Sequence, residues 1–218
     1  MVIGVAMMAA MVPTTLALNE ATRGQESSEA KRKENERRKV CHLTATCPID
    51  ADPATERGEV HNAKVYLGVD HKLTGRVKLY ICKRPTDSMT AFKGHLFSLP
   101  ELKEGNLNGL VAVSGELPPT LRWVYLNKST YEMEWGGKND REGHISGPFD
   151  MTRDENYLSL DSTQRWLAVR VGDAECESME ADIGLWRLLV DWDEDGGSFL
   201  PPGSESVHIF LRRDPESS

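Results

Sequence analysis

Residues 121–135 have the sequence LRWVYLNKSTYEMEW, and this stretch indicates the fold class most clearly. Two runs rich in aromatic and β-branched side chains, 121–126 and 130–135, flank the segment Asn127-Lys128-Ser129. Runs of this kind around a short loop that contains Asn are typical of a β-hairpin, here with a three-residue loop. We therefore predict two antiparallel strands joined at residues 127–129.

Side chains in each predicted strand alternate between the two faces of the hairpin. The residues that share one face in each strand are Leu121, Trp123 and Tyr125, and then Tyr131, Met133 and Trp135. Cross-strand aromatic pairs of this kind contribute about 0.2–1 kcal/mol each. The hairpin therefore predicts an aromatic face.

The same period of two continues on both sides of the hairpin. Six further runs carry apolar residues at alternate positions: Cys41, Leu43, Ala45 and Cys47; Ala63, Val65 and Leu67; Val77, Leu79 and Ile81; Leu167, Val169 and Val171; Trp186, Leu188, Val190 and Trp192; Val207, Ile209 and Leu211. Alternation puts one face on a core and the other in water, which favours antiparallel pairing.

Gly and Pro residues separate these runs at short intervals, as in Pro118-Pro119 and Gly136-Gly137. The pattern predicts a mainly β protein, an antiparallel sandwich or small barrel of about 8–10 strands. We expect one β-rich domain over residues 40–212, followed by a polar tail at 213–218. No internal repeat is evident.

Two segments precede this domain. Residues 1–18 are apolar, and they form an N-terminal extension or a weak signal peptide that lacks a basic start. Residues 19–39 are polar on every face and contain Glu-first i,i+4 pairs such as Glu29 with Lys33, which predict a charged helix or linker. The missing basic start favours a cytoplasmic protein, and secretion is the alternative.

Composition excludes several classes of protein. The chain has 218 residues, 39% of them hydrophobic, and a net charge of −8. Lys and Arg residues that neutralise phosphates supply most of the affinity in general nucleic-acid binding, so this charge argues against a nucleic-acid partner. No apolar run reaches the roughly 20 residues that span a bilayer, so we expect no transmembrane segment.

The four cysteines are Cys41, Cys47, Cys82 and Cys176. Cys41 and Cys47 lie about 20 Å apart if they share a strand, which is too far for a disulfide. Either of them could reach Cys82 on a neighbouring strand in an oxidising compartment. Buried core thiols are the default expectation.

Acidic residues concentrate near the C-terminus. The window 173–195 contains nine carboxylates and one arginine. Within it, Asp191, Asp193, Asp195 and Gly196 match the opening D-x-D-x-D-G of a calcium loop, in which alternate oxygen ligands converge on one hard cation. Pro202 occupies the twelfth position, where such loops have Glu. Calcium is therefore the one cofactor that the sequence indicates, and an acidic hairpin turn is the alternative.

No catalytic motif is present, and the histidines are scattered along the chain. The candidate partner-binding residues are the aromatic side chains of the hairpin, because exposed aromatics are enriched at binding sites. These residues are Trp123, Tyr125, Tyr131 and Trp135. Asn127 begins an N-K-S glycosylation sequon, which matters if the chain is secreted.

Two resemblances bear on this interpretation. Tyr125, Asn127, Thr130 and Trp135 have the spacing of the second half of a WW domain, but that module's first strand is missing. Over roughly residues 29–212 the chain is similar to a group of small β-rich proteins of filamentous fungi. The matching segments are the charged helix leading into Val40–Cys47, the hairpin Trp123–Gly136, and Gly143–Asp150. The resemblance implies a β-rich fold and no particular activity, catalytic residue or cofactor.

The leading functional hypothesis is a binding module without catalytic residues, whose partner is a protein or a small apolar ligand. The first alternative is a small barrel enzyme of fungal secondary metabolism, a cyclase or isomerase that orients an apolar substrate within a cavity. The second alternative is a secreted, effector-like protein.

Overall fold

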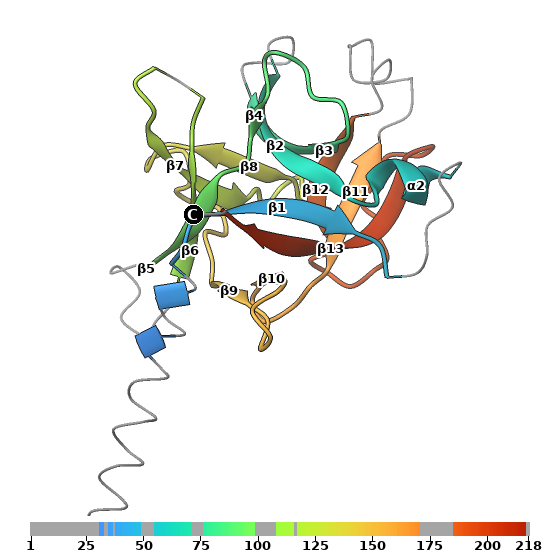
Figure 1. Ribbon diagram of the computed structural model, residues 1–218. Helices are drawn as coiled ribbons and strands as arrows, with labels where there is room; N and C mark the ends of the chain where they lie inside the picture. Colours follow the sequence, from blue (N-terminus) through green and yellow to red (C-terminus); the bar gives the residue numbers. More distant parts are fainter. Residues whose placement is uncertain are drawn as a thin grey trace, which may run out of the picture. The chain divides into compact units, whose positions relative to one another are not determined.

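The computed structural model describes residues 31–32, 35–36, 38–48, 55–70, 76–98, 108–115, 117–170 and 185–216. Residues Lys39–Ser218 form one compact unit. The described residues contain helical turns at 31–32 and 35–36, one short helix within the compact unit, and thirteen strands (Figure 1). In chain order they are β1 (Cys41–Thr46), α2 (Glu56–Val60), β2 (Ala63–Asp70), β3 (Arg76–Cys82), β4 (Thr90–Ala91), β5 (Gly94–Ser98), β6 (Asn108–Val113), β7 (Leu121–Leu126), β8 (Met133–Gly136), β9 (Phe149–Met151), β10 (Leu158–Leu160), β11 (Trp166–Arg170), β12 (Trp186–Val190) and β13 (Glu205–Pro215).

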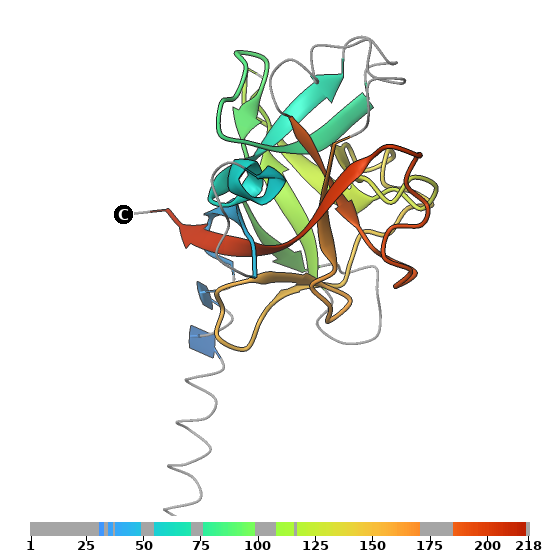
Figure 2. The ribbon, with the colours of Figure 1, turned by 90° about the vertical axis from the view of Figure 1, so that its right-hand side faces the viewer.

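Six strands form a closed barrel. β1 pairs antiparallel with β13 and β5, β5 pairs with β6, and β9 pairs with β10. β6 lies beside β9, and an isolated bridge between Tyr157 and Arg212 links the start of β10 to β13, which closes the ring. In Figure 2, β13 is the long red strand that crosses the molecule.

Three hairpins, β2–β3, β7–β8 and β11–β12, join these barrel strands. Their second strands meet one another, because β3 pairs with both β12 and β8. An isolated bridge between Glu132 and Leu189 links β8 to β12. In Figure 1 the hairpins β2–β3 and β7–β8 lie above β1 and β13, and β9 and β10 lie below them.

The topology therefore repeats three times along the chain. Each unit contributes a barrel strand, a hairpin and a second barrel strand: β1 to β5, β6 to β9, and β10 to β13. The first unit also contains the two-residue strand β4. The three units share strand order without sharing a recognisable sequence, so the repeat is visible in the architecture and not in the sequence.

One hydrophobic core fills the space between the barrel and the hairpins. Trp166, Trp186, Phe92 and Phe149 are its largest fully buried side chains. Burying each such side chain contributes about 1.5–3 kcal/mol. The alternate residues predicted to face the core in β1, β2, β3, β12 and β13 lie in this cluster, except that Val77 and Trp192 are only partly buried against it.

The alternation in β11 is a partial exception. Leu167 and Val169 lie in a separate cluster with Leu189, while Trp166 and Ala168 of the same strand reach the main core. Phe199 and Leu200 pack against that second cluster. Both faces of β11 are therefore buried, and neither is the solvent face that the alternation predicts.

The hairpin β7–β8 forms, but its predicted three-residue loop is wrong. The Asn127 N–H donates to the Glu132 carbonyl at 2.9 Å, so the loop contains the four residues 128–131. Tyr131 in this loop has a left-handed φ of 54°. The longer loop shifts the pairing by an odd number of residues, which moves every side chain of one strand to the other face.

The observed register pairs Val124 with Trp135 and Tyr125 with Glu134. Trp135 therefore lies on the core side, where its Nε1–H donates to the Gly68 carbonyl at 3.2 Å. Trp123 lies opposite Gly136 on the outer side. The predicted aromatic face shared by both strands does not form.

A mainly β, antiparallel, barrel-like fold is confirmed, with more strands than predicted. Strands of two or three residues, such as β4, β9 and β10, are too short to show a period. β13 continues to Pro215, so strand pairing reaches into the predicted tail. The apolar segment 1–18 and most of the predicted charged helix at 19–39 lie outside the described residues. No described helix is long and apolar enough to cross a membrane.

Charged side chains are buried where the three hairpins meet. A single oxygen of Glu132, Oε1, accepts from Lys78 Nζ at 3.0 Å and from Arg187 Nη1 at 3.1 Å. Lys78 and Glu132 are 4% and 7% exposed. Lys78 lies in β3, Arg187 lies in β12, and Glu132 directly precedes β8. We call these three residues the hairpin ion cluster, because it links one hairpin to the other two.

Replacing Glu132 with Ala should destabilise the protein strongly, because it leaves the buried Lys78 ammonium without a carboxylate. Breaking a buried pair in this way costs about 3–5 kcal/mol. We expect Glu205→Ala, which removes a half-exposed partner of Arg170, to cost less than about 1 kcal/mol. Urea unfolding measures both free energies, and equal losses in the two variants would contradict the assigned role of the hairpin ion cluster.

Candidate functional site

The outer faces of β5, β6 and β7 carry a group of aromatic side chains. The register places His95 opposite Val111, and Val111 opposite Trp123. Phe97 lies opposite Gly109, which has no side chain, so the Phe97 ring can lean across β6 toward β7. We call His95, Phe97, Trp123, Tyr125, Arg141 and His144 the aromatic surface.

The rings of this surface contact one another in defined geometries. Phe97 and Trp123 form an edge-to-face pair, with centroids 5.7 Å apart and an interplanar angle of 87°. His95 and Phe97 form a second such pair at 6.5 Å. The Arg141 guanidinium carbon lies 4.3 Å from the Trp123 ring centroid, a cation–π contact. His144 stacks on Tyr125 at 5.3 Å. These contacts hold the exposed rings in place.

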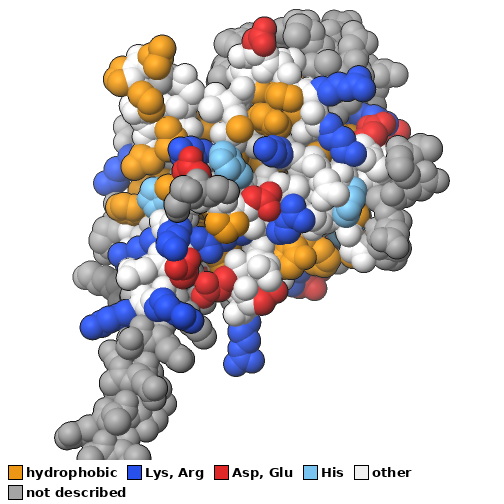
Figure 3. Space-filling view, viewed as in Figure 1, with side chains coloured by type: hydrophobic (Ala, Val, Ile, Leu, Met, Phe, Trp, Pro, Cys, Tyr) orange, Lys and Arg blue, Asp and Glu red, His pale blue; other side chains and the backbone are white. Residues whose placement is uncertain are grey.

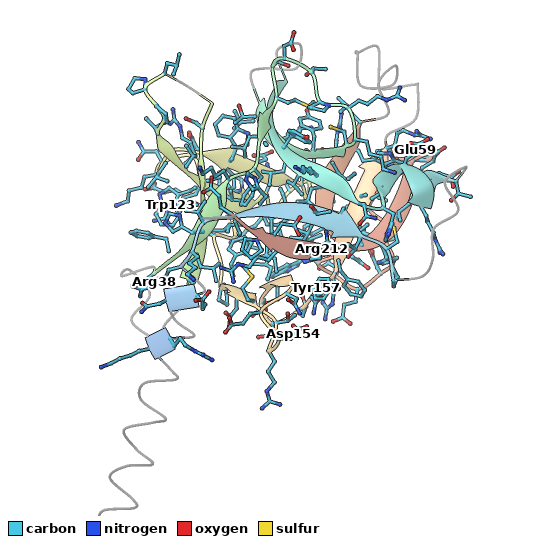
Figure 4. The ribbon with its side chains drawn as sticks, in the orientation of Figure 1. Arg38, Glu59, Trp123, Asp154, Tyr157 and Arg212 are labelled. Carbon is cyan, nitrogen blue, oxygen red and sulfur yellow. The ribbon has the colours of Figure 1, made fainter. Side chains whose placement is uncertain are left out.

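Exposed hydrophobic side chains lie on and beside this surface. The described residues include three exposed large hydrophobic side chains: Phe97 at 44%, Leu121 at 56% and Leu117 at 94%. Leu121 begins β7, and Leu117 lies in the loop before it. Figure 3 shows hydrophobic side chains between basic and His side chains on the side where Figure 1 places β5 to β7, and Figure 4 labels Trp123 there. Apolar side chains grouped in this way mark interaction sites.

Tyr125 forms the buried floor of this surface. It is 3% exposed, and burial, followed by the nearby charges of Glu134 and Asp140, raises its pKa to about 12. Glu134 in turn accepts from Asn127 Nδ2 at 3.0 Å. Tyr125 therefore stays protonated at neutral pH and supports the exposed rings.

His95 carries a buried nitrogen that lacks a partner. Its Nδ1 is inaccessible to solvent and has no hydrogen bond. Burial lowers the pKa of His95 below the ordinary value of 6.5. The His95 ring is therefore mostly uncharged at pH 7, so it adds no positive charge to the surface beside Phe97.

The structure separates the four aromatic residues predicted as one binding surface. Trp123 and Tyr125 belong to the aromatic surface. Trp135 is only 7% exposed and lies in the core on the opposite face of the hairpin. The Tyr131 hydroxyl donates to Asp193 Oδ2 at 2.6 Å, and its ring packs edge-to-face on Phe199.

The sequence interpretation did not assign His95, Phe97, Arg141 or His144 to a binding surface. Gly94-His95-Leu96-Phe97 alternates apolar and polar residues only weakly, so it gave little sign of a strand. Arg141 and His144 lie in the loop between β8 and β9. Their proximity to Trp123 and Tyr125 follows from the fold and has no local signature.

The described cysteines fit the default prediction. Cys41, Cys47 and Cys82 are buried free thiols. Burial raises the pKa of all three, and that of Cys82 to about 11. Such thiols are poor nucleophiles. Cys176 lies outside the described residues.

The predicted glycosylation sequon and the calcium loop remain predictions. The side-chain amide of Asn127 already donates to Glu134. In the part of the chain that the structure describes, no group of three or more His, Cys, Asp or Glu side chains is placed to hold a metal. Asp193 is bonded to Tyr131, and Asp195 accepts from the Ser198 hydroxyl and from two backbone N–H groups.

A six-stranded barrel joined to three hairpins, in three units of the same topology, defines a β-trefoil. The family model of the fungal beta-trefoil domain matches residues 17–216. The chain therefore belongs to the fungal beta-trefoil domain family. Comparison with curated proteins found no match, and comparison with solved structures found none.

Membership of this family agrees with the resemblance to fungal β-rich proteins. The resemblance to a WW domain is not supported. Tyr125, Asn127 and Trp135 belong to a hairpin of the β-trefoil, and Trp135 is buried in its core.

The lowered pKa of His95 predicts a pH dependence of stability. Below pH 6.5 the unfolded chain binds a proton at His95 more readily than the folded protein does. The contribution of His95 to the free energy of unfolding is therefore highest above pH 6.5, and it is lost as the pH falls through the lowered pKa. We expect His95→Gln to flatten the pH profile over this window. Urea unfolding between about pH 5 and 8 measures it. Parallel profiles for the two proteins would contradict the assignment.

Proposed function

We propose that the protein is a non-catalytic binding module that docks a protein partner through the aromatic surface. The observation that carries this proposal is the Phe97 ring, 44% exposed, packed on Trp123 beneath Arg141. Exposing an ordered aromatic group is unfavourable in the free protein. Covering it with a partner recovers about 25 cal/mol for each Å² of apolar surface buried.

The composition of the surface favours a protein over a small apolar ligand. Aromatic residues and Arg are enriched where proteins bind each other, and Trp, Tyr and Arg supply most hot spots. Phe97, Trp123 and Leu121 lie on the same face of one sheet, and Phe97 contacts Trp123 directly. Small-molecule sites are concave and enclose about 70–90% of the ligand. A sheet face suits a partner that supplies its own complementary surface.

The enzyme alternative expects an open cavity inside the barrel. The side chains of the described barrel strands that point inward are instead buried in one continuous core. These residues are Leu43, Ala45, Leu96, Leu110, Ala112, Phe149, Met151, Leu158, Leu160, Ile209 and Leu211. This packing supports a binding role for the outer surface over chemistry inside the barrel.

The proposal predicts that truncating the exposed rings weakens partner binding and leaves the fold intact. We expect Phe97→Ala and Trp123→Ala each to weaken binding by about 10- to 100-fold, the effect typical of interface hot spots. Partners are captured with the full-length wild-type chain from an extract of the source organism. The captured protein is then purified, and its affinity for each variant is measured by calorimetry.

His208→Ala is the matched control, because His208 is an exposed ring on β13 in another part of the barrel. We expect it to bind like the wild type. Circular dichroism of each variant checks the fold. A purified partner that binds Phe97→Ala and Trp123→Ala as tightly as the wild type would overturn the proposed docking surface.

A further inference from the structure

The turn after β12, residues Asp191–Gly196, contains a carboxylate that is held firmly in place. Asp191 is 6% exposed. Its backbone N–H donates to the Arg165 carbonyl at 2.9 Å, and its Oδ2 accepts from the Gly196 N–H at 3.2 Å. We call residues 191–196 the acidic turn. The Asp191 side chain thus points into the loop that this turn forms.

The other carboxylate oxygen of Asp191 is unsatisfied. Oδ1 is inaccessible to solvent and has no hydrogen-bond partner. Leaving a buried polar atom without a hydrogen bond destabilises the protein, and the cost is larger when the atom carries charge. Buried charges in proteins are paired or coordinate metals, so a cation at Oδ1 would remove that cost.

Two more aspartates lie close to this oxygen along the chain. Asp193 and Asp195 occupy alternate positions after Asp191, and both side chains are exposed. Glu194 and Gly196 have positive φ angles of 58° and 72°, which curl the backbone around Asp191. The two carboxylates do not converge on Asp191 in the described structure, because Asp193 accepts from Tyr131 and Asp195 accepts from Gly197 and Ser198. A cation would have to replace these exposed hydrogen bonds, and exposed side chains can change rotamer within nanoseconds to allow it.

The charge of the acidic turn favours a cation. It contains four carboxylates in five residues. Arg165 forms an ion pair with Glu194, the one carboxylate outside the alternating set. In the described ranges, the three aspartates of the turn have no ion-pair partner. Their hydrogen-bond donors, which include the Tyr131 and Ser198 hydroxyls and backbone N–H groups, are neutral, so the negative charge of the three aspartates is not balanced within the turn.

We propose that the acidic turn binds a divalent calcium ion through Asp191 Oδ1 and the rotated carboxylates of Asp193 and Asp195. Backbone carbonyls and water complete the oxygen shell. Calcium accepts six to eight oxygen ligands in flexible geometry, whereas magnesium requires a near-ideal octahedron, so a loop that adjusts its side chains suits calcium. Because Pro202 stands where a bidentate Glu would strengthen binding, we expect a Kd of about 10⁻⁴–10⁻³ M.

The test is a calcium titration of the full-length chain by calorimetry, together with terbium luminescence sensitised by Trp192 in the turn. We expect saturable binding of one ion per chain and displacement of terbium by calcium. Asp191→Asn preserves the size of the side chain and an acceptor for Gly196, and it should weaken binding at least tenfold. Asp193→Asn changes an exposed residue that is not needed for folding, and it should also weaken binding.

Asp154→Asn is the matched control. Asp154 is an exposed aspartate in the turn between β9 and β10, where it accepts from Thr152 and Asn156 (Figure 4). We expect this variant to bind calcium like the wild type. Equal affinity in the wild type, Asp191→Asn and Asp193→Asn would overturn the site and assign the ion to other acidic residues. A titration that shows no saturation at a calcium concentration about tenfold above the expected Kd would also overturn the site.

Discussion

The structure depends on how the three hairpins meet at the hairpin ion cluster. Glu132 accepts from Lys78 of one hairpin and from Arg187 of another through the same oxygen. Burying these charges is costly unless they are paired, so the cluster disfavours arrangements that separate the three strands. The hydrophobic core beneath the hairpins is tolerant by comparison, because apolar side chains of similar volume can replace one another. We infer that the ion pairs favour this arrangement of the hairpins, while apolar burial in the core supplies most of the stability.

The aromatic surface is a consequence of that arrangement. Glu132 is fixed beside Lys78 and Arg187, and it pairs with Asn127 at the end of β7. This pairing fixes the register of β7 against β8, which sends Trp135 into the core and Trp123 outward. Phe97 then meets Trp123 because β5 and β6 continue the same sheet. The candidate docking site is therefore assembled by strands that belong to two of the three units.

The sequence correctly predicted those features of the fold that are set by the residues of a single strand. Period-two alternation identified the core faces of β1, β2 and β13, because burial on one side of a strand is a local property. The hairpin register was not predictable in this way, since the left-handed Tyr131 lengthens the loop by one residue without a glycine to mark it. The threefold architecture left no repeat, because equivalent strands need only apolar residues, not identical ones. The aromatic surface combined residues more than 40 positions apart, such as Phe97 and Arg141.

The register of β7 against β8 is the central claim, since it decides which aromatic side chains a partner can reach. Nuclear magnetic resonance of the labelled protein tests it directly, through cross-strand contacts between backbone protons. The structure predicts contacts that join Val124 to Trp135 and Leu126 to Met133. Contacts that join Trp123 to Met133 and Tyr125 to Tyr131 would instead show the three-residue loop, and they would contradict both the buried position of Trp135 and the aromatic surface.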